Sequence, residues 1–155
     1  MIPLLSPSVA TLVPMRDRPG LLHDDLTRSI IGGFYTSYTE MGYGLLERVY
    51  ARALDEELRR RGHQVEREVW ADVIYRGTPV SRQRIDRIID RKVVLEIKAT
   101  DVLPPYAKRQ LLTYLRVTGL EVGLILHYGP TPEFERMVAS HRPFRGIDEI
   151  PDEHG

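Results

Sequence analysis

The chain has 155 residues, of which 42% are hydrophobic and 28% charged, and its 22 basic residues are balanced by 22 acidic ones. This composition is typical of a soluble folded domain and excludes disordered, collagen-like and coiled-coil proteins. The chain has no cysteine, which excludes disulfides, cysteine-ligated metal centres and a thiol nucleophile. It also fits a reducing compartment, so we expect a cytoplasmic location.

Both ends of the chain are expected to lie outside the folded body. Residues 1–22 lack the basic start of a secretory signal, and we expect a disordered or loosely attached segment, with Met1 or Met15 as the native start. No apolar run reaches the roughly 20 residues that a membrane-spanning helix needs. The body is placed at residues 23–129. Residues 130–155 are expected to form an extension with a short helix at 133–140 and an acidic tail.

Two helices are predicted ahead of the first strand. Asp24 and Asp25 put negative charge at a helix N-terminus, and the pattern continues to about residue 38. Apolar residues then recur at helical spacing over residues 45–61, and Gly62 follows as a stop.

Strand-forming residues dominate the middle of the chain. Segments 65–75, 84–90 and 93–98 are separated by short turns and predict an antiparallel meander. A helix over 106–118 begins after two prolines and ends at Gly119, and an apolar strand follows over 122–128. The order predicts an α/β (α+β) fold, with a mixed central sheet flanked by helices.

Three acidic residues stand where chemistry is plausible. Glu47 shares a helix face with Tyr50, which predicts a carboxylate on the apolar side. Glu96 and Lys98 are two apart in a strand and therefore share a face. A tight hairpin would set Asp86 opposite Glu96. Adjacent carboxylates repel unless a cation lies between them, and hard oxygen ligands favour Mg²⁺ or Mn²⁺. Such a site suits phosphodiester hydrolysis by a metal-activated water.

These residues resemble a known family. Asp86 and the run Glu96-Ile97-Lys98 resemble the signature of the PD-(D/E)XK nuclease superfamily, although Ile85 stands in place of its proline. Residues 44–50, GLLERVY, resemble the GxxExxY motif of a bacterial and archaeal branch. Residues 110–114, QLLTY, resemble the QxxxY motif of RecB-like nucleases. The order of elements from 45 to 128 resembles the restriction-endonuclease-like αβββαβ core, here with an extra N-terminal helix.

The resemblance implies a Mg²⁺-dependent nuclease with DNA as its substrate and RNA as the alternative. By this resemblance Glu47, Asp86 and Glu96 hold the metal and Lys98 assists. Gln110 and Tyr114, which share a helix face, support the site.

Basic residues near the acids are candidates for phosphate contacts, and they are Arg82, Arg84, Arg87 and Lys108. They fit a solvated charged face equally well. Glu96 and Lys98 could instead be a protective charge pair on an edge strand, and Trp70 is most simply a core residue.

Other functions stay open at this point. The main alternative is a catalytically silent nucleic-acid-binding or protein-interaction module on the same fold. A phosphatase-like enzyme is a weaker alternative, because no phosphate-cradling loop is evident. At this chain length a homodimer or a protein partner could supply specificity.

Overall fold

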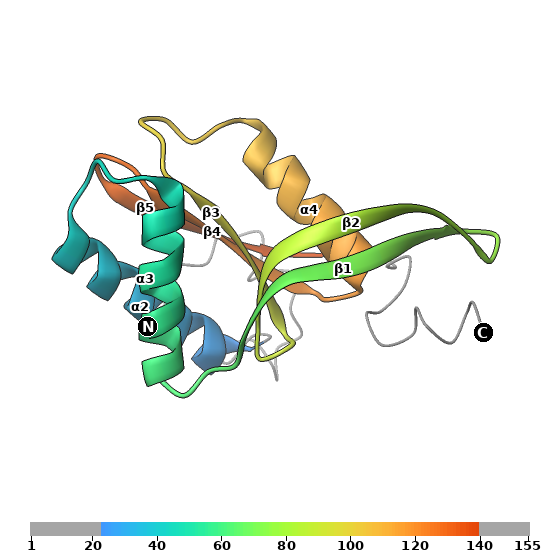
Figure 1. The fold of residues 1–155 in the computed structure, drawn as a ribbon, viewed down its shortest axis with the longest axis horizontal. Helices are drawn as coiled ribbons and strands as arrows, with labels where there is room; N and C mark the ends of the chain where they lie inside the picture. The colour runs from blue at the N-terminus through green and yellow to red at the C-terminus, as the bar shows by residue number, and fades with distance from the viewer. Residues whose placement is uncertain (1–22, 140–155) are drawn as a thin grey trace, which may run out of the picture.

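The computed structural model describes residues 23–139 (Figure 1). The expected N-terminal segment and acidic tail lie outside this range. The elements are α2 (Asp24–Met41), α3 (Glu47–Arg60), β1 (Val65–Tyr75), β2 (Thr78–Ile89), β3 (Val93–Lys98), α4 (Tyr106–Thr118), β4 (Val122–Tyr128) and β5 (Pro132–Val138). None of these helices is long and apolar enough to cross a membrane.

The five strands form one mixed sheet in the order β1-β2-β3-β4-β5. Strands β3 and β4 are parallel, because α4 carries the chain back between them, and every other neighbouring pair is antiparallel. The three helices and the mixed sheet confirm the predicted fold class, including the additional N-terminal helix.

The C-terminal part of the sheet corrects one prediction. Residues 133–140 were expected to include a short helix, but Pro132–Val138 is strand β5, paired antiparallel with β4. The sheet therefore extends past residue 129, where the folded body was expected to end. Every residue of β4 is buried, and a fully buried strand needs hydrogen-bonding partners on both edges. This tertiary demand outweighs the weak helical pattern of the segment.

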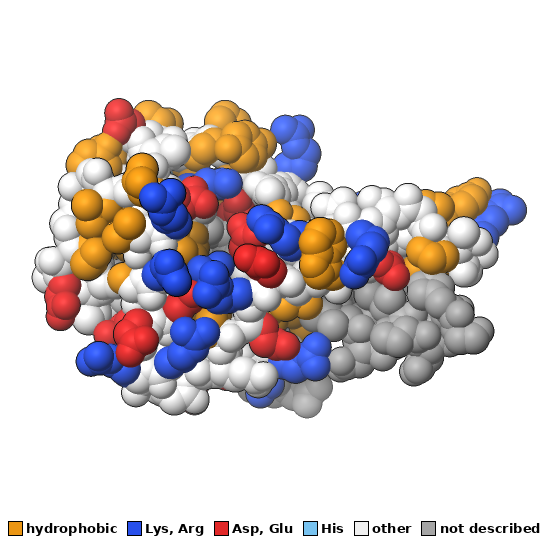
Figure 2. Space-filling view, in the orientation of Figure 1, with side chains coloured by type: hydrophobic (Ala, Val, Ile, Leu, Met, Phe, Trp, Pro, Cys, Tyr) orange, Lys and Arg blue, Asp and Glu red, His pale blue; other side chains and the backbone are white. Residues whose placement is uncertain are grey.

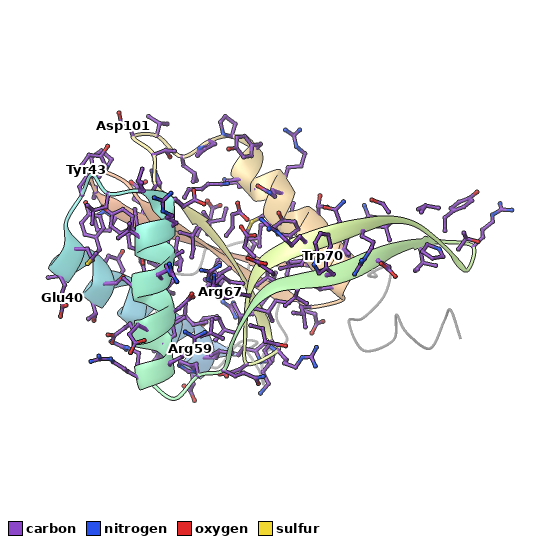
Figure 3. All side chains as sticks on the ribbon, in the orientation of Figure 1. Glu40, Tyr43, Arg59, Arg67, Trp70 and Asp101 are labelled. Atoms are coloured by element: carbon purple, nitrogen blue, oxygen red, sulfur yellow. The ribbon has the colours of Figure 1, made fainter. Side chains whose placement is uncertain are left out.

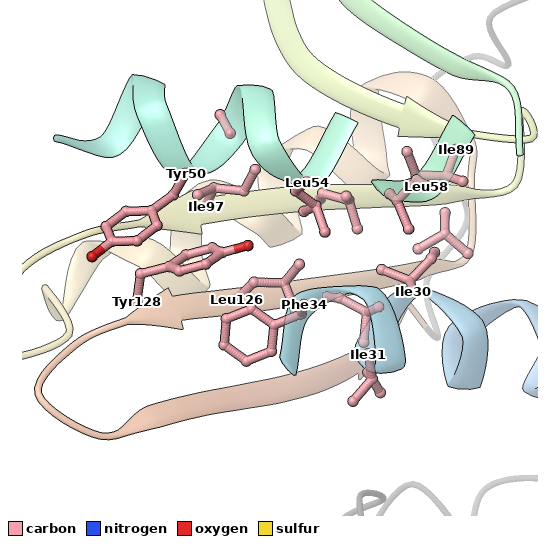
Figure 4. Packing of buried hydrophobic residues seen from close by; sticks show 14 of the residues in the cluster. Ile30, Ile31, Phe34, Tyr50, Leu54, Leu58, Ile89, Ile97, Leu126 and Tyr128 are labelled. Carbon is pink, nitrogen blue, oxygen red and sulfur yellow. The ribbon is translucent and has the colours of Figure 1, made fainter. Parts of the chain in front are cut away.

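Helices cover both faces of the sheet and create two cores. On one face α2 and α3 pack against β3 and β4 around a cluster that includes Phe34, Tyr50 and Tyr128. The rings of Tyr50 and Tyr128 stack with centroids 4.3 Å apart, and Phe34 meets Tyr128 edge-on at 4.8 Å (Figure 4). On the other face α4 buries Leu111 and Leu115 against strands β2, β3 and β4. Fixed cores on both faces hold the strand ends in place.

The β1–β2 hairpin reaches well beyond the other strands (Figure 1). Strand β2 has 12 residues but pairs with β3 only over Arg87–Ile89. We call residues 70–84 the hairpin arm. Its inner base is anchored where Ala71 packs against Val117 of α4, whereas its tip stands clear of the body. Trp70, expected in the core, lies on this arm with 51% of its surface exposed.

Candidate active site

Asp86 and Glu96 meet where β2 and β3 separate. The ladder pairs Ile89 with Val93 and Arg87 with Leu95, so one further step in the same register sets Asp86 opposite Glu96. This is the register that the short turn predicts. Beyond this point the two strands part, and the Asp86 side chain is 51% exposed while Glu96 is only 4% exposed. One buried and one accessible carboxylate therefore lie at the point where the two strands separate.

Lys98 is bound directly to Glu96. Its Nζ lies 2.9 Å from Oε2 of Glu96, and the ring of Tyr106 stands over the ammonium at 5.1 Å. Desolvation by burial would lower the pKa of Lys98, but the hydrogen bond and the charges of Glu96 and Glu47 outweigh it and raise that pKa. Lys98 is therefore a positively charged group at neutral pH.

The pKa of Glu96 is also raised, although Lys98 opposes the shift. Burial is the largest cause, and the nearby negative charges of Asp86 and Glu47 add to it. Glu96 is more buried than its lysine partner and faces two further carboxylates, which explains why both pKa values of the pair move upward. A bound cation would relieve this concentration of negative charge.

Glu47 reaches the same region from α3, but not as predicted. It is the first residue of the helix and is exposed, whereas Tyr50 and Leu54 of that face are fully buried. A carboxylate is favoured at this first position of the helix, because the helix N-terminus carries partial positive charge. Partial desolvation raises the pKa of Glu47, Lys98 opposes the rise, and Asp86 adds to it.

A cleft of about 320 Å³ opens Glu47 and Asp86 to solvent, and its β3 lining is Leu95 and Ile97 rather than Glu96 and Lys98. It lies between α3 and the base of the hairpin, and both Glu47 and Asp86 line it together with Arg48, Arg52 and Arg84. In Figure 2 basic and acidic side chains alternate over this part of the surface, between α3 and the arm. The cleft is accordingly polar and of mixed charge.

Gln110 and Tyr114 lie on α4, which covers the face of the sheet to which Val94 and therefore Glu96 point. Nε2 of Gln110 donates a hydrogen bond to the Tyr114 hydroxyl at 2.6 Å, which confirms that the two share one helix face. Burial raises the pKa of Tyr114, the Gln110 hydrogen bond opposes this, and the charges of Glu96 and Asp86 add to the rise. Within residues 23–139, Oε1 of Gln110 is buried without a hydrogen-bond partner, so the site holds a free oxygen acceptor.

The four basic candidates lie in different surroundings. Arg84 lies on the rim, with Nη2 3.5 Å from Asp86, and Arg82 follows on the hairpin arm. Lys108 is bound instead to Glu135 of β5 at 3.0 Å, and it does not line the cleft.

Arg87 needs a correction, because it is buried rather than available to a phosphate. Its Nε and Nη2 donate to both carboxylate oxygens of Asp55 at 2.7 and 2.9 Å, and Nη1 donates to the Asp86 carbonyl oxygen at 3.2 Å. With all three nitrogens bound to protein, Arg87 acts as a tie between α3 and β2.

The sequence interpretation missed two residues that support the site. Asp55 is 2% exposed and binds Arg87, and its spacing of three from Leu58 on the apolar stripe was a usable signal. Tyr106 covers Lys98, and its place at the start of α4 carried no comparable signal.

A larger cavity, of about 410 Å³, lies beside β5 and is lined by residues that include His127, Glu133 and Phe134. None of the predicted site residues lines it. His127 is 3% exposed, and its Nε2 lies 2.7 Å from the Thr100 carbonyl oxygen, as expected for a capped residue at the edge of the core.

The donor chemistry of the candidate site suits a hard divalent cation. Carboxylates from three elements and the free oxygen of Gln110 are the ligand type that Mg²⁺ prefers. Within the described part of the chain, however, no three acidic or histidine side chains already form a group able to hold a metal ion. Oε2 of Glu96 is already paired with the ammonium group of Lys98. Metal binding would therefore require at least one of these side chains to turn.

Comparison with known proteins agrees with the fold. A model of the PD-(D/E)XK nuclease superfamily matches residues 24–137. No curated protein matches the chain. A solved structure titled "Crystal structure of SSO0001" is 18% identical, with a TM-score of 0.39 over 83% of this chain and 70% of the other. That likeness is too low to carry an argument, so the superfamily match stands on its own.

Proposed function

The chain belongs to the PD-(D/E)XK nuclease superfamily, and on that premise we propose that it hydrolyses phosphodiester bonds in DNA with the help of Mg²⁺ or Mn²⁺. The observation that carries the proposal is the convergence of Glu47, Asp86 and Glu96 beside a charged lysine. They come from α3, β2 and β3 and interact electrostatically with one another.

Each residue has a distinct task in this proposal. Glu47, Asp86 and Glu96 would hold the metal, which when bound polarises the phosphate and lowers the pKa of a water molecule. Lys98, kept protonated by Glu96, would neutralise charge on the phosphate as the bond breaks. Gln110 offers its buried oxygen as an acceptor for a water proton. Arg84, on the rim, would contact the phosphate backbone.

Metal binding and cleavage should be tested together. Calorimetry with Mn²⁺ would compare the wild type with Glu96→Gln and with Glu56→Gln, which changes a glutamate that is 63% exposed elsewhere on α3. The same proteins would be incubated with single- and double-stranded DNA and RNA. We expect Glu96→Gln to lose both metal binding and cleavage, and Glu56→Gln to keep both.

The Lys98→Met variant separates metal binding from cleavage. It should abolish cleavage while leaving metal binding intact, because lysine is not a metal ligand in this proposal.

The absence of a formed three-ligand group within residues 23–139 favours one alternative, a silent nucleic-acid-binding or interaction module. That alternative predicts equal, weak Mn²⁺ binding by all variants, and metal-independent DNA binding without cleavage. Such a result would overturn the nuclease proposal.

A further inference from the structure

The outer face of the hairpin arm carries a large aromatic side chain between arginines. Trp70 of β1 is paired in register with Arg84 of β2, and Asp72 with Arg82. The guanidinium carbon of Arg82 lies 4.9 Å from the centre of the Trp70 rings. In Figure 2 basic side chains flank a hydrophobic one at the place where Figure 3 labels Trp70.

The exposure of the Trp70 indole is unusual for so large an aromatic side chain. Half of Trp70 is exposed, and Tyr75 and Val80 toward the tip are exposed as well, at 61% and 59%. Opposite Trp70, on the inner face of the hairpin, the neighbouring Ala71 is 1% exposed. The strand therefore buries a small residue and leaves its largest one in solvent, against the hydrophobic gain that burial would bring.

The charge of the arm matches a polyanion. Residues 70–84 contain Arg76, Arg82 and Arg84 against the single acid Asp72. An aromatic ring flanked by arginines is the surface on which unpaired bases stack while their phosphates meet the guanidinium groups. A base inside a duplex is already stacked on both sides and cannot use such a ring.

Trp70 and Arg82, which we call the platform, also lie at a distance from the cleft that a short nucleic-acid strand can span. Trp70 stands opposite Arg84, which is two residues before Asp86 on the same strand. Two residues of strand span about 7 Å, which is close to two stacked nucleotides at roughly 3.4 Å each. Arg84 is level with Trp70, and its Nη2 reaches to 3.5 Å from Asp86, so its side chain links the two places.

We propose that this chain takes a single-stranded nucleic acid, with Trp70 and Arg82 holding an unpaired base about two nucleotides from the phosphate at Asp86. This inference rests on the nuclease proposed above and names the form of its substrate.

Trp70 is the only tryptophan in the chain, so its intrinsic fluorescence reports directly on the platform. Titration of the full-length protein in EDTA with an oligothymidylate of about 6 nucleotides should quench the emission. An abasic oligomer of the same length should bind without quenching. Binding to a labelled oligomer, followed by anisotropy, should weaken roughly 5- to 150-fold in Trp70→Ala, the range that corresponds to stacking of one base. Trp70→Phe should restore most of the affinity.

Tyr75→Ala is the matched control, because Tyr75 is an exposed aromatic of the same strand, about 17 Å farther toward the tip. It should change the affinity by less than about twofold, since a short oligomer held at Trp70 does not depend on it. Unchanged binding by Trp70→Ala, equal losses in both variants, equal quenching by the abasic oligomer, or a duplex that competes as well as the single strand would each overturn the platform.

Cleavage distinguishes failure of this inference from failure of the proposed function. If the wild type cleaves DNA in a Glu96-dependent way while Trp70→Ala binds normally, the platform is wrong and the nuclease stands. If no variant cleaves but the single strand still quenches Trp70, the platform stands and the nuclease is wrong.

Discussion

Removal of either partner of the Asp55–Arg87 pair should loosen α3 from β2. The two side chains are 2% and 8% exposed and share two hydrogen bonds of 2.7 and 2.9 Å. Arg67 adds a weaker contact, with Nε 3.9 Å from Asp55. Because α3 carries Glu47 and β2 carries Asp86, this pair fixes the spacing of two proposed metal ligands.

The expected loss of folding stability is large for a single interaction. Unit charges roughly 4 Å apart attract by about 4 kcal/mol at an effective dielectric constant of about 20. Deleting one partner of a buried pair costs about 3–5 kcal/mol, because the other charge stays buried and unpaired. A domain of this size is stable by about 5–15 kcal/mol. At roughly 2–4 °C per kcal/mol, Asp55→Ala or Arg87→Ala should lower Tm by roughly 6–20 °C.

Urea unfolding followed by circular dichroism would measure this loss, at low salt and again at about 1 M salt. The buried pair should respond little to salt. Arg60→Ala is the control, since its pair with Glu56 is 73% and 63% exposed and should contribute less than about 1 kcal/mol. The double variant Asp55→Leu/Arg87→Met should regain most of the stability, because apolar side chains leave no buried charge.

A loss below about 1 kcal/mol in either single variant would refute this reasoning, since it would mean that solvent reaches the pair. So would a double-mutant cycle with Asp55→Ala and Arg87→Ala that shows no coupling.

Three further outcomes follow from the structure. Mg²⁺ at about 100 times its Kd should raise the free energy of unfolding by about 2.7 kcal/mol, and scanning calorimetry should find no such gain in Glu96→Ala. Burial and the charge of Lys92 lower the pKa of His23 from its ordinary 6.5. As the pH falls, the unfolded state therefore takes up this proton before the folded state does. The stability that is present above pH 6.5 is lost as the pH falls toward the lowered folded pKa. In urea unfolding at several pH values, His23→Gln should lack this contribution to the dependence of the unfolding free energy on pH. A Cβ at Gly123 would lie 2.7 Å from Leu111 Cδ1, so Gly123→Ala should cost about 1–3 kcal/mol in thermal unfolding, and Leu111→Val should recover part of it.

Local pattern was enough to predict most of the fold. The bounds of β1, β3, α4 and β4 agree with the predicted segments, because a period of two or of 3.6 residues and the Gly and Pro stops act over neighbouring residues. The register of Asp86 against Glu96 followed from the short turn for the same reason. Strand β5 was missed, since its pairing depends on the second hydrogen-bonding edge of β4 and not on its own residues.

The candidate site was likewise predictable only in part from the sequence. The sequence by itself determined the order and spacing of Glu47, Asp86, Glu96 and Lys98, and thereby the strand face that the last two share.

Only the tertiary structure decided how deeply each charged or aromatic residue lies. It left Glu47 exposed at the end of its helix, buried Arg87 against Asp55 and carried Trp70 out onto the hairpin arm. Burial depends on which distant element covers a side chain, and charge pairs such as Asp55–Arg87 join residues 32 positions apart. Local periodicity has no access to such contacts, because the packing of whole helices against the sheet creates them.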